Sequence, residues 1–304
     1  MKSVVARITG GLGNQLINYA VALGIAERTG RKVVLDLTDF VIFPGGRKYQ
    51  LGHFAGPSRA RHWNYFWSAC FLFAWIIGKR LSARFFARCC SVMRIRVLQS
   101  DKIIDFDPCF VDDGLKRTND VLYLIGVYGH LPYLPSDATL REAFRLNAEP
   151  TGQNRLMLEK ICGANSVSIH VRRSDYLQIS NGCVALSAKY YRSAIAAMSQ
   201  RISEPLWVVF SDDIPWCRAE FAFLDNAVFV EGNGDQPWED LRLMMACRHH
   251  IIANSSFSWC GAVLGRDPKG ITLYPDPWFP GANVRPTTVR SEWISVPSFW
   301  VKDE

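Results

Sequence analysis

Short apolar runs alternate with helix-length segments along much of this 304-residue chain. Near its start, an apolar run at 4–8 is followed by a glycine turn at 10–13, a helical pattern over 14–29 that ends at Gly30, and a second apolar run at 33–37. A strand, a helix and a strand in this order favour a parallel sheet, because the helix carries the chain back to the starting edge. We therefore expect an α/β fold.

The alternation is lost over residues 40–115, although 121–126 predicts another buried strand, and it is clearest after residue 150. There the pattern predicts strands at 166–171, 206–210, 227–230, 250–253 and 271–274, and helices at 154–162, 188–202, 215–221, 237–247 and 256–264. Ser187 has a suitable side chain to cap the second of these helices. We expect two Rossmann-like domains, residues 1–150 and 151–304, facing a central ligand cleft. The tail at 286–304 is expected to pack across that cleft or onto the first domain.

Charge is unevenly distributed along the chain. Residues 1–150 hold 20 Lys and Arg against 12 Asp and Glu, whereas residues 151–304 hold 15 against 16. Residues 40–100 contain ten Lys and Arg and no acidic residue, and they surround an uncharged run at 66–77 that is rich in aromatic residues. This run is shorter than the roughly 20 residues that cross a bilayer. Two interpretations stay open: a core helix with solvated arginines, or docking of residues 59–96 on an anionic membrane surface. Nucleic-acid binding is disfavoured, because no recognised binding motif accompanies the charge.

The nine cysteines are scattered, with one adjacent pair, Cys89-Cys90, and no CxxC spacing. Such spacing indicates neither a disulfide framework nor a zinc site. No secretory signal is recognisable, because Met1-Lys2-Ser3 leads directly into a strand pattern. We therefore expect a cytoplasmic protein, with a peripheral position on the inner face of the plasma membrane if residues 59–96 dock there.

Two adjacent arginines, Arg172 and Arg173, directly follow the predicted strand at 166–171. Open α/β sheets bind ligands at the carboxyl ends of their strands, and a guanidinium is a planar fork of donors suited to phosphate oxygens. The pair therefore predicts a diphosphate site, with Asp175 close enough to orient one guanidinium. The alternative is two solvated arginines after an edge strand.

The glycine turn offers a second anion site, because backbone N–H groups at a helix start approach an anion closely. Gly11, Gly13, Asn14 and Gln15 are its candidate binding residues. The turn is a poor dinucleotide fingerprint, because Leu16 stands where a third glycine belongs, and it lacks the lysine of a P-loop. A tight turn with no ligand is the alternative.

A third segment rich in polar groups, Asn254-Ser255-Ser256-Phe257-Ser258, opens the last predicted helix. Its hydroxyls and backbone donors suit an anion, although capping by one serine also explains one hydroxyl. Asp212-Asp213 follows the strand at 206–210 and lacks the DxD spacing of a metal-bridged sugar-nucleotide site. Asp213 is predicted either to cap the next helix or to contact a ribose or base.

Four ordered motifs between residue 6 and about 275 resemble those of bacterial α-1,2-fucosyltransferases, the glycosyltransferases of family 11. They are Gly10-Gly-Leu-Gly-Asn-Gln15 with Tyr19-Ala20, His170-Val-Arg-Arg-Ser-Asp-Tyr176, Phe210-Ser-Asp-Asp213 and Ala253-Asn-Ser-Ser-Phe-Ser-Trp-Cys-Gly-Ala262. The sequence departs from the family pattern at Ser174, where Gly is usual, at Cys260, where a second Trp is usual, and at Asn18, where Gln is common.

The resemblance implies a GT-B-like fold. The first domain would lean toward the acceptor and carry a basic, aromatic helical insertion at about 55–100, and the second domain would bind the nucleotide sugar. Arg172 and Arg173 would contact the GDP phosphates. Ser255, Ser256 and Ser258 would surround the same phosphates, Asn254 and Phe257 would belong to the same donor-binding segment, and His170 or Asp213 would lie near the nucleoside. The catalytic candidates are Arg172, Asn14 and Asp175; the last is either the base or, more simply, the carboxylate that holds Arg173.

The expected activity is inverting transfer of L-fucose from GDP-L-fucose to a galactose hydroxyl in α-1,2 linkage, without a metal or another cofactor. The acceptor would be a galactose-terminated oligosaccharide or a lipid-linked glycan in surface polysaccharide synthesis. Three alternatives remain open: another GDP-hexose donor, an α-1,3 linkage, or a non-catalytic protein that binds a glycan or a nucleotide.

Overall fold

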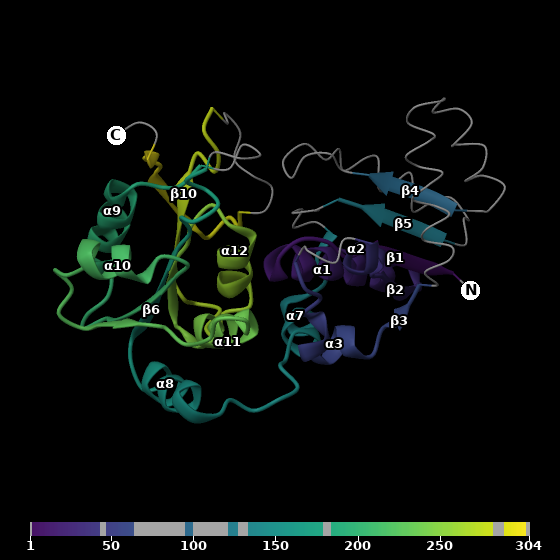
Figure 1. Cartoon of the computed structure of the whole chain (residues 1–304), viewed down its shortest axis with the longest axis horizontal. Helices are drawn as coiled ribbons and strands as arrows, with labels where there is room; N and C mark the ends of the chain where they lie inside the picture. The colour runs from purple at the N-terminus through teal and green to yellow at the C-terminus, as the bar shows by residue number, and fades with distance from the viewer. Residues whose placement is uncertain are drawn as a thin grey trace. The chain divides into compact units, whose positions relative to one another are not determined.

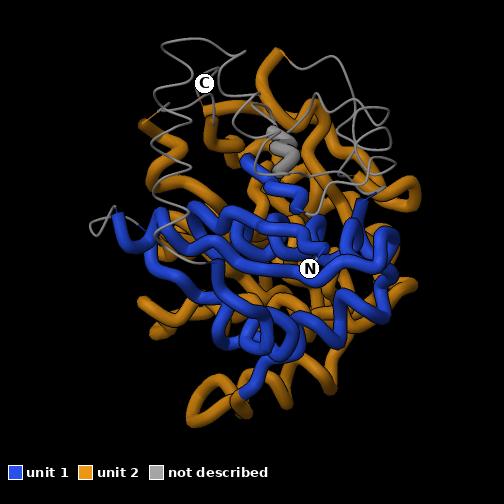
Figure 2. The backbone as a smooth tube through the Cα atoms, turned by 90° about the vertical axis from the view of Figure 1, so that its right-hand side faces the viewer, with its two compact units in different colours: residues 1–147 blue, residues 148–304 orange. Residues whose placement is uncertain are grey.

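The computed structural model describes residues 2–42, 47–63, 95–99, 121–126, 133–178, 184–281 and 289–301. The chain divides into two compact units, residues 1–147 and 148–304, which Figure 2 shows in blue and orange. This boundary lies within three residues of the expected one. Each unit contains one parallel sheet with helices packed against it, so the expected α/β class with two Rossmann-like units is confirmed.

The first unit has a five-stranded sheet in the order β3-β2-β1-β5-β4, and all its neighbouring strands are parallel. Its strands are β1 Ser3–Arg7, β2 Lys32–Asp36, β3 Arg61–His62, β4 Ile95–Gln99 and β5 Val121–Ile125. Its helices are α1 Leu12–Thr29, α2 Thr38–Ile42, a 3₁₀ turn at Leu51–His53, α3 Ala55–Ser58 and α7 Asp137–Ala143 (Figure 1).

Helix α1 is the long buried element of the first unit, and its sequence explains both its end and its packing. It ends at Gly30, which adopts the left-handed conformation with a φ of 63° and donates its N–H to the carbonyl of Ala26. At Gly24, a Cβ would lie 2.0 Å from the carbonyl oxygen of Tyr133. A side chain is therefore excluded there, because the backbone of residues 133–135 lies directly against the helix.

The second unit has a six-stranded parallel sheet in the order β11-β10-β9-β6-β7-β8. Its strands are β6 Ser166–Val171, β7 Leu206–Ser211, β8 Ala227–Phe229, β9 His249–Ile251, β10 Thr272–Asp276 and β11 Ile294–Pro297. Its helices are α8 Gly152–Cys162, α9 Ala188–Ser199, α10 Ile214–Glu220, α11 Pro237–Ala246 and α12 Ser256–Val263 (Figure 1). From β6 the chain builds outward through β7 and β8 and then returns to β9 on the other side. The order of strands therefore reverses between β6 and β9, which is where such sheets bind ligands.

Alternating side chains of β6 serve the two faces of this sheet. Val167, Ile169 and Val171 pack with α9 and α10 in one buried apolar cluster. On the other face, α11 packs against residues of β7 in a second apolar cluster, and α12 covers the same side in Figure 1. Because both faces are covered, β6 is buried along its whole length, although Ser166, Ser168 and His170 alternate with its apolar residues.

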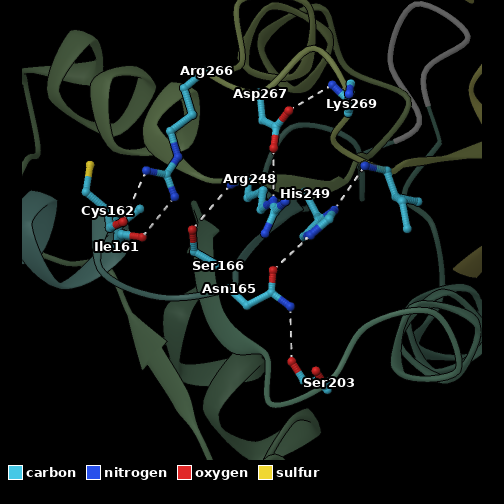
Figure 3. A network of polar contacts seen from close by, with 11 residues as sticks. Ile161, Cys162, Asn165, Ser166, Ser203, Arg248, His249, Arg266, Asp267 and Lys269 are labelled. Atoms are coloured by element: carbon cyan, nitrogen blue, oxygen red, sulfur yellow. Dashed lines mark hydrogen bonds and ion pairs between the residues drawn. The ribbon is translucent and has the colours of Figure 1, made fainter.

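A network of polar contacts closes the amino ends of β6, β9 and β10 (Figure 3). The His249 ring accepts the backbone N–H of Ile271 at Nδ1 (3.0 Å), and its Nε2 lies 3.1 Å from Oδ1 of Asn165. Since Nδ1 accepts, the neutral ring carries its proton on Nε2 and donates it to Asn165. Burial and the neighbouring Arg248 lower the pKa of His249 below its usual value. The polar groups at the amino ends of these strands therefore stabilise the fold.

Two details of the second unit differ from expectation. Over its described part the tail belongs to the second unit, because β11 pairs with β10 and Trp300 forms a bridge with Leu186. Ser187 occupies the position before α9, but its hydroxyl makes no capping bond and is buried. The tail strand was missed because it is only four residues long and includes Pro297.

The basic, aromatic insertion predicted at about 55–100 falls mostly on residues 64–94, which lie outside the described residues. In the part of the chain that the structure does describe, none of the helices combines the length and the apolar character needed to cross a membrane. The choice between a core helix and a membrane-docking segment at 66–77 stays a prediction.

Candidate functional site

Three of the four motifs meet at the carboxyl ends of β6, β7 and β9 in the second unit. Arg172 and Arg173 follow β6, Asp212 and Asp213 lie at the end of β7, and the segment 254–258 follows β9. Two contacts join the segments across the point where the strand order reverses. Nδ1 of His170 lies 2.6 Å from Oγ of Ser258, and the Tyr176 hydroxyl donates to the carbonyl of Asn254 at 3.4 Å. The arginines and the polar helix start are therefore neighbours, as expected.

Arg172 is held between two carboxylates. Its Nη2 lies 2.9 Å from Oδ1 of Asp175, and its Nη1 lies 2.8 Å from Oδ2 of Asp212. The guanidinium also stands over the ring of Tyr176, 5.7 Å from its centroid. A guanidinium has five N–H donors, so these two ion pairs leave three for a ligand. With 24% of its side chain exposed, Arg172 is fixed in orientation and still open to solvent.

Arg173 is more enclosed and has different partners. Its Nε donates to Oδ2 of Asp213 (3.1 Å), its backbone N–H donates to Oδ1 of Asp212 (2.9 Å), and its guanidinium lies 4.0 Å from the ring centroid of Trp216. The expectation that Asp175 holds Arg173 is wrong, because Asp175 pairs with Arg172. The alternative of two solvated arginines is also wrong, because both are anchored.

Asp213 caps the helix that follows it. One carboxylate oxygen accepts the backbone N–H of Trp216 at 3.2 Å, and the other accepts Nε of Arg173. The capping alternative for Asp213 is therefore confirmed. A contact with a ribose or base is not needed to explain its position, so we assign Asp213 to holding Arg173.

His170 is a buried, neutral imidazole at the centre of the site. Burial, followed by the charge of Arg172, lowers the pKa of His170 to about 4. Its partner Ser258 is fully buried, and the Ser258 hydroxyl also accepts the backbone N–H of Ala253 at 3.0 Å. The hydroxyl of Ser258 is thus used within the protein. We therefore assign Ser258 to positioning His170 and not to the predicted contact with phosphate.

Some polar groups at the start of α12 are used within the protein, and one has no partner there. Ser255 is the capping residue, because its Oγ accepts the backbone N–H of Phe257 at 3.3 Å. Asn254 donates Nδ2 to the carbonyl of Val184 at 3.1 Å, whereas its buried Oδ1 has no hydrogen-bond partner. That oxygen can only accept, and phosphate oxygens do not donate. Asn254 therefore suits a ligand hydroxyl or N–H group better than the predicted phosphate.

The glycine turn belongs to the first unit, and Gln15 does not serve there as predicted. Its side chain is fully buried; Nε2 donates to the carbonyls of Gly10 (2.9 Å) and Lys48 (2.8 Å), and Oε1 accepts the N–H of Gln50 (3.0 Å). Every polar atom of the amide is thus used to hold a neighbouring loop, so the prediction that Gln15 binds the ligand is wrong.

The other residues of that turn keep a position suited to a ligand. Gly11 precedes α1, whose first turn contains Gly13 and Asn14. Gly10 has a φ of +74°, which favours glycine. Contacts with a ligand stay predictions for Gly11, Gly13 and Asn14.

Several functional neighbours were missed in the sequence. Asp212 and Tyr176 lie inside the quoted motifs, so their proximity to Arg172 was a signal that could have been used. In the first unit, Asp36 at the carboxyl end of β2 accepts the Tyr123 hydroxyl and the Thr38 N–H (2.9 Å). Nothing in the spacing of these residues indicated that contact.

Among the described residues, no group of three or more His, Cys, Asp or Glu side chains is arranged to hold a metal ion. The charged groups around Arg172 and Arg173 are three carboxylates, those of Asp175, Asp212 and Asp213. All three pair with a guanidinium, which gives each an evident role without a metal.

Comparisons with known proteins identify the family of the chain. The family model described as glycosyl transferase family 11 matches residues 127–296. An α-1,2-colitosyltransferase of Escherichia coli is 32% identical over 92% of this chain and 93% of its own length. The O-antigen biosynthesis glycosyltransferase WbnK of Escherichia coli is 28% identical over 95% of this chain and 99% of its own length. The mouse galactoside 2-alpha-L-fucosyltransferase Sec1 is 30% identical over 56% of this chain and 48% of its own length.

Solved structures show the same fold at low sequence identity. The fucosyltransferase NodZ from Bradyrhizobium has a TM-score of 0.51 and 15% identity, covering 92% of this chain and 97% of that one. A variant of FUT1 from Arabidopsis thaliana in complex with GDP has a TM-score of 0.53 and 11% identity, covering 91% of this chain and 71% of that one. With its two parallel sheets, the chain is therefore GT-B-like, as expected.

Proposed function

Since the chain belongs to glycosyltransferase family 11, we propose that it transfers L-fucose from GDP-L-fucose to a galactose hydroxyl in α-1,2 linkage. The second unit binds the donor in this proposal, and the first unit binds the acceptor. The observation that carries it is Arg172, anchored by Asp175 and Asp212 beside the start of α12 with three N–H donors to spare.

The chemistry requires positive charge where the leaving group develops negative charge. As the bond between fucose and GDP breaks, the sugar becomes oxocarbenium-like and the β-phosphate gains charge. Donors fixed in advance at that position stabilise the transition state more than the ground state. Arg172 meets this requirement, because its two ion pairs hold the guanidinium in place before the donor binds.

Inversion at the anomeric carbon needs a group that accepts the proton of the acceptor hydroxyl. Asp175 is our candidate base, because 45% of its side chain is exposed, compared with 20% for Asp212 and 32% for Asp213. The buried, neutral His170 is not our candidate base; it packs inside the site against Ser258.

A second donor deserves a direct test, because one similar protein is an α-1,2-colitosyltransferase. Colitose is L-fucose without the 3-hydroxyl group. A site that hydrogen-bonds this hydroxyl rejects the deoxy sugar strongly, by about 10⁴-fold or more, whereas a site that ignores it discriminates little. The unpartnered Oδ1 of Asn254 is an acceptor of the kind that such recognition needs.

The deciding experiment compares kcat/KM for GDP-L-fucose, GDP-colitose and GDP-mannose with galactose-terminated oligosaccharides, followed by linkage analysis of the product. We expect GDP-L-fucose to give the highest kcat/KM and the product to be α-1,2-linked. A preference for GDP-colitose would change the proposed donor, and an α-1,3 product would change the proposed linkage. Neither result would change the proposed mechanism. GDP binding without turnover on any acceptor would show a non-catalytic binding protein.

Activity is expected to survive EDTA. Arg172 supplies the positive charge that a bridging metal supplies in metal-dependent transferases. The measurement is the initial rate after dialysis against EDTA, with and without added Mn²⁺ or Mg²⁺. A rate that falls to background and returns on adding Mn²⁺ would contradict the assignment of Arg172.

The name of WbnK refers to O-antigen biosynthesis. We propose surface polysaccharide synthesis as the setting, with a galactose-terminated oligosaccharide or a lipid-linked glycan as the acceptor. We also propose that the protein lies peripherally on the inner face of the plasma membrane, where a lipid-linked acceptor would be.

A further inference from the structure

A basic cavity of about 700 Å³ lies in the first unit, at the amino ends of β2 and β3. Four of its lining residues are cations, and one is an acid. Arg31 and Lys32 come from the turn between α1 and β2, Arg59 and Arg61 come from the segment around the start of β3, and the acid is Glu27. We call these four cations with their cavity the basic cavity.

Three of the four cations of the basic cavity are not explained by pairing within the described part of the protein. Lys32, Arg59 and Arg61 are exposed, and their side chains form no hydrogen bond or ion pair with any described residue. Helix α1 ends nearby, and a helix C-terminus favours one adjacent cation. That effect accounts for one of the four, so the remaining charge is available to a ligand.

The position of the basic cavity separates it from the nucleotide-sugar chemistry. In a parallel α/β sheet, ligands of the reaction bind at the carboxyl ends of the strands. The basic cavity lies at the amino ends, where α1 finishes and β2 begins. It therefore calls for an anionic partner other than the reacting groups.

We propose that the basic cavity binds the phosphates of anionic phospholipid headgroups and docks the protein on a membrane surface. The cavity volume falls within the ordinary range for small-molecule sites, about 300 to 1,000 Å³. Apolar side chains also line it, including Leu23 and Val33, which suits the boundary between headgroups and acyl chains. Four cations beside apolar side chains fit a membrane surface better than a single soluble phosphate does.

The test is sedimentation of the full chain with vesicles of phosphatidylcholine alone or mixed with phosphatidylglycerol at three to one. The test variant is Lys32→Gln, Arg59→Gln, Arg61→Gln. The matched control is Arg155→Gln, Lys160→Gln, Lys269→Gln, which removes three exposed cations from the second unit. Each cation near an anionic surface contributes about fivefold in binding. We expect the test variant to bind mixed vesicles at least tenfold more weakly and the control variant to stay within threefold of the parent.

Three outcomes would overturn the proposal: equal binding by the test variant and the parent, equal binding to both kinds of vesicle, or binding to an RNA oligonucleotide in place of vesicles. Release from vesicles by 10 mM inorganic phosphate (about this concentration, at constant ionic strength) would indicate a site for a soluble phosphate instead. Turnover of a soluble oligosaccharide is expected to be unchanged in the test variant, which shows that it folds. Vesicle binding does not depend on the identity of the sugar donor, so it can fail while the proposed function holds.

Discussion

Replacing Arg172 with alanine is expected to lower kcat by at least a hundredfold. The guanidinium is our assigned partner of the leaving diphosphate, and the loss of one fixed donor to a developing oxyanion costs about 10² to 10³ in rate. The two carboxylates that hold Arg172, Asp175 and Asp212, would then add repulsion toward the phosphates. The measurement is kcat with saturating GDP-L-fucose, together with the thermal unfolding midpoint of the variant.

Two further variants make this result specific. Arg218→Ala removes a half-exposed arginine that pairs with Glu231 outside the site, and it should keep kcat within twofold. Arg172→Lys keeps the charge but loses the fork geometry, so it should recover only part of the rate. If Arg172→Ala retained a third of the parent kcat with normal folding, Arg172 could not be the group that stabilises the leaving phosphate.

Mild acid is expected to destabilise the second unit strongly. Burial lowers the pKa of His170 to about 4 and that of His250 to about 3, whereas an unfolded histidine titrates near 6.5. Below pH 6.5 the unfolded chain takes up protons that the folded chain refuses, so the free energy of unfolding falls as the pH falls. Well above pH 6.5 the two rings do not change the free energy of unfolding. Between pH 6.5 and pH 5 each ring lowers that free energy by about 2 kcal/mol.

The measurement is urea unfolding at pH 7 and pH 5 at constant ionic strength. His250→Gln removes one of the three buried rings whose pKa is lowered, those of His170, His249 and His250. The difference between the two pH values should therefore shrink by about 2 kcal/mol, whatever the stability of the variant at pH 7. His62→Gln, at an exposed position of β3, should leave that difference unchanged. Equal stability of the parent at the two pH values would mean that these rings are hydrated or already charged in the folded protein.

The strands and helices of the second unit could be predicted from the sequence because each strand is buried on both faces. Strand β6 was predicted to the residue, and α8, β7 and α11 within two residues at each end. Periodicity reports burial, and here burial follows the strand along its whole length. The short β11 carries too few residues to show a period, so its place in the second sheet was not predicted.

The site was predicted at the level of segments and not at the level of partners. That Arg172 and the start of α12 share one edge follows from topology, because both follow neighbouring parallel strands. Which carboxylate pairs with Arg172, or whether the amide of Gln15 faces a ligand or a backbone, depends on side-chain direction and on distant loops such as that of Lys48. Spacing in the sequence carries no information about either.

The amino ends and the carboxyl ends of the strands in the second sheet have different roles. The contacts of His249 and Asn165 secure one edge, whereas the residues assigned to the reaction lie on loops at the other. Substitutions in those loops can therefore alter the preferred sugar without weakening the scaffold. Laboratory evolution of new donors should concentrate its mutations in the loops that follow β6 and β9 and leave Arg172 and Asp175 unchanged.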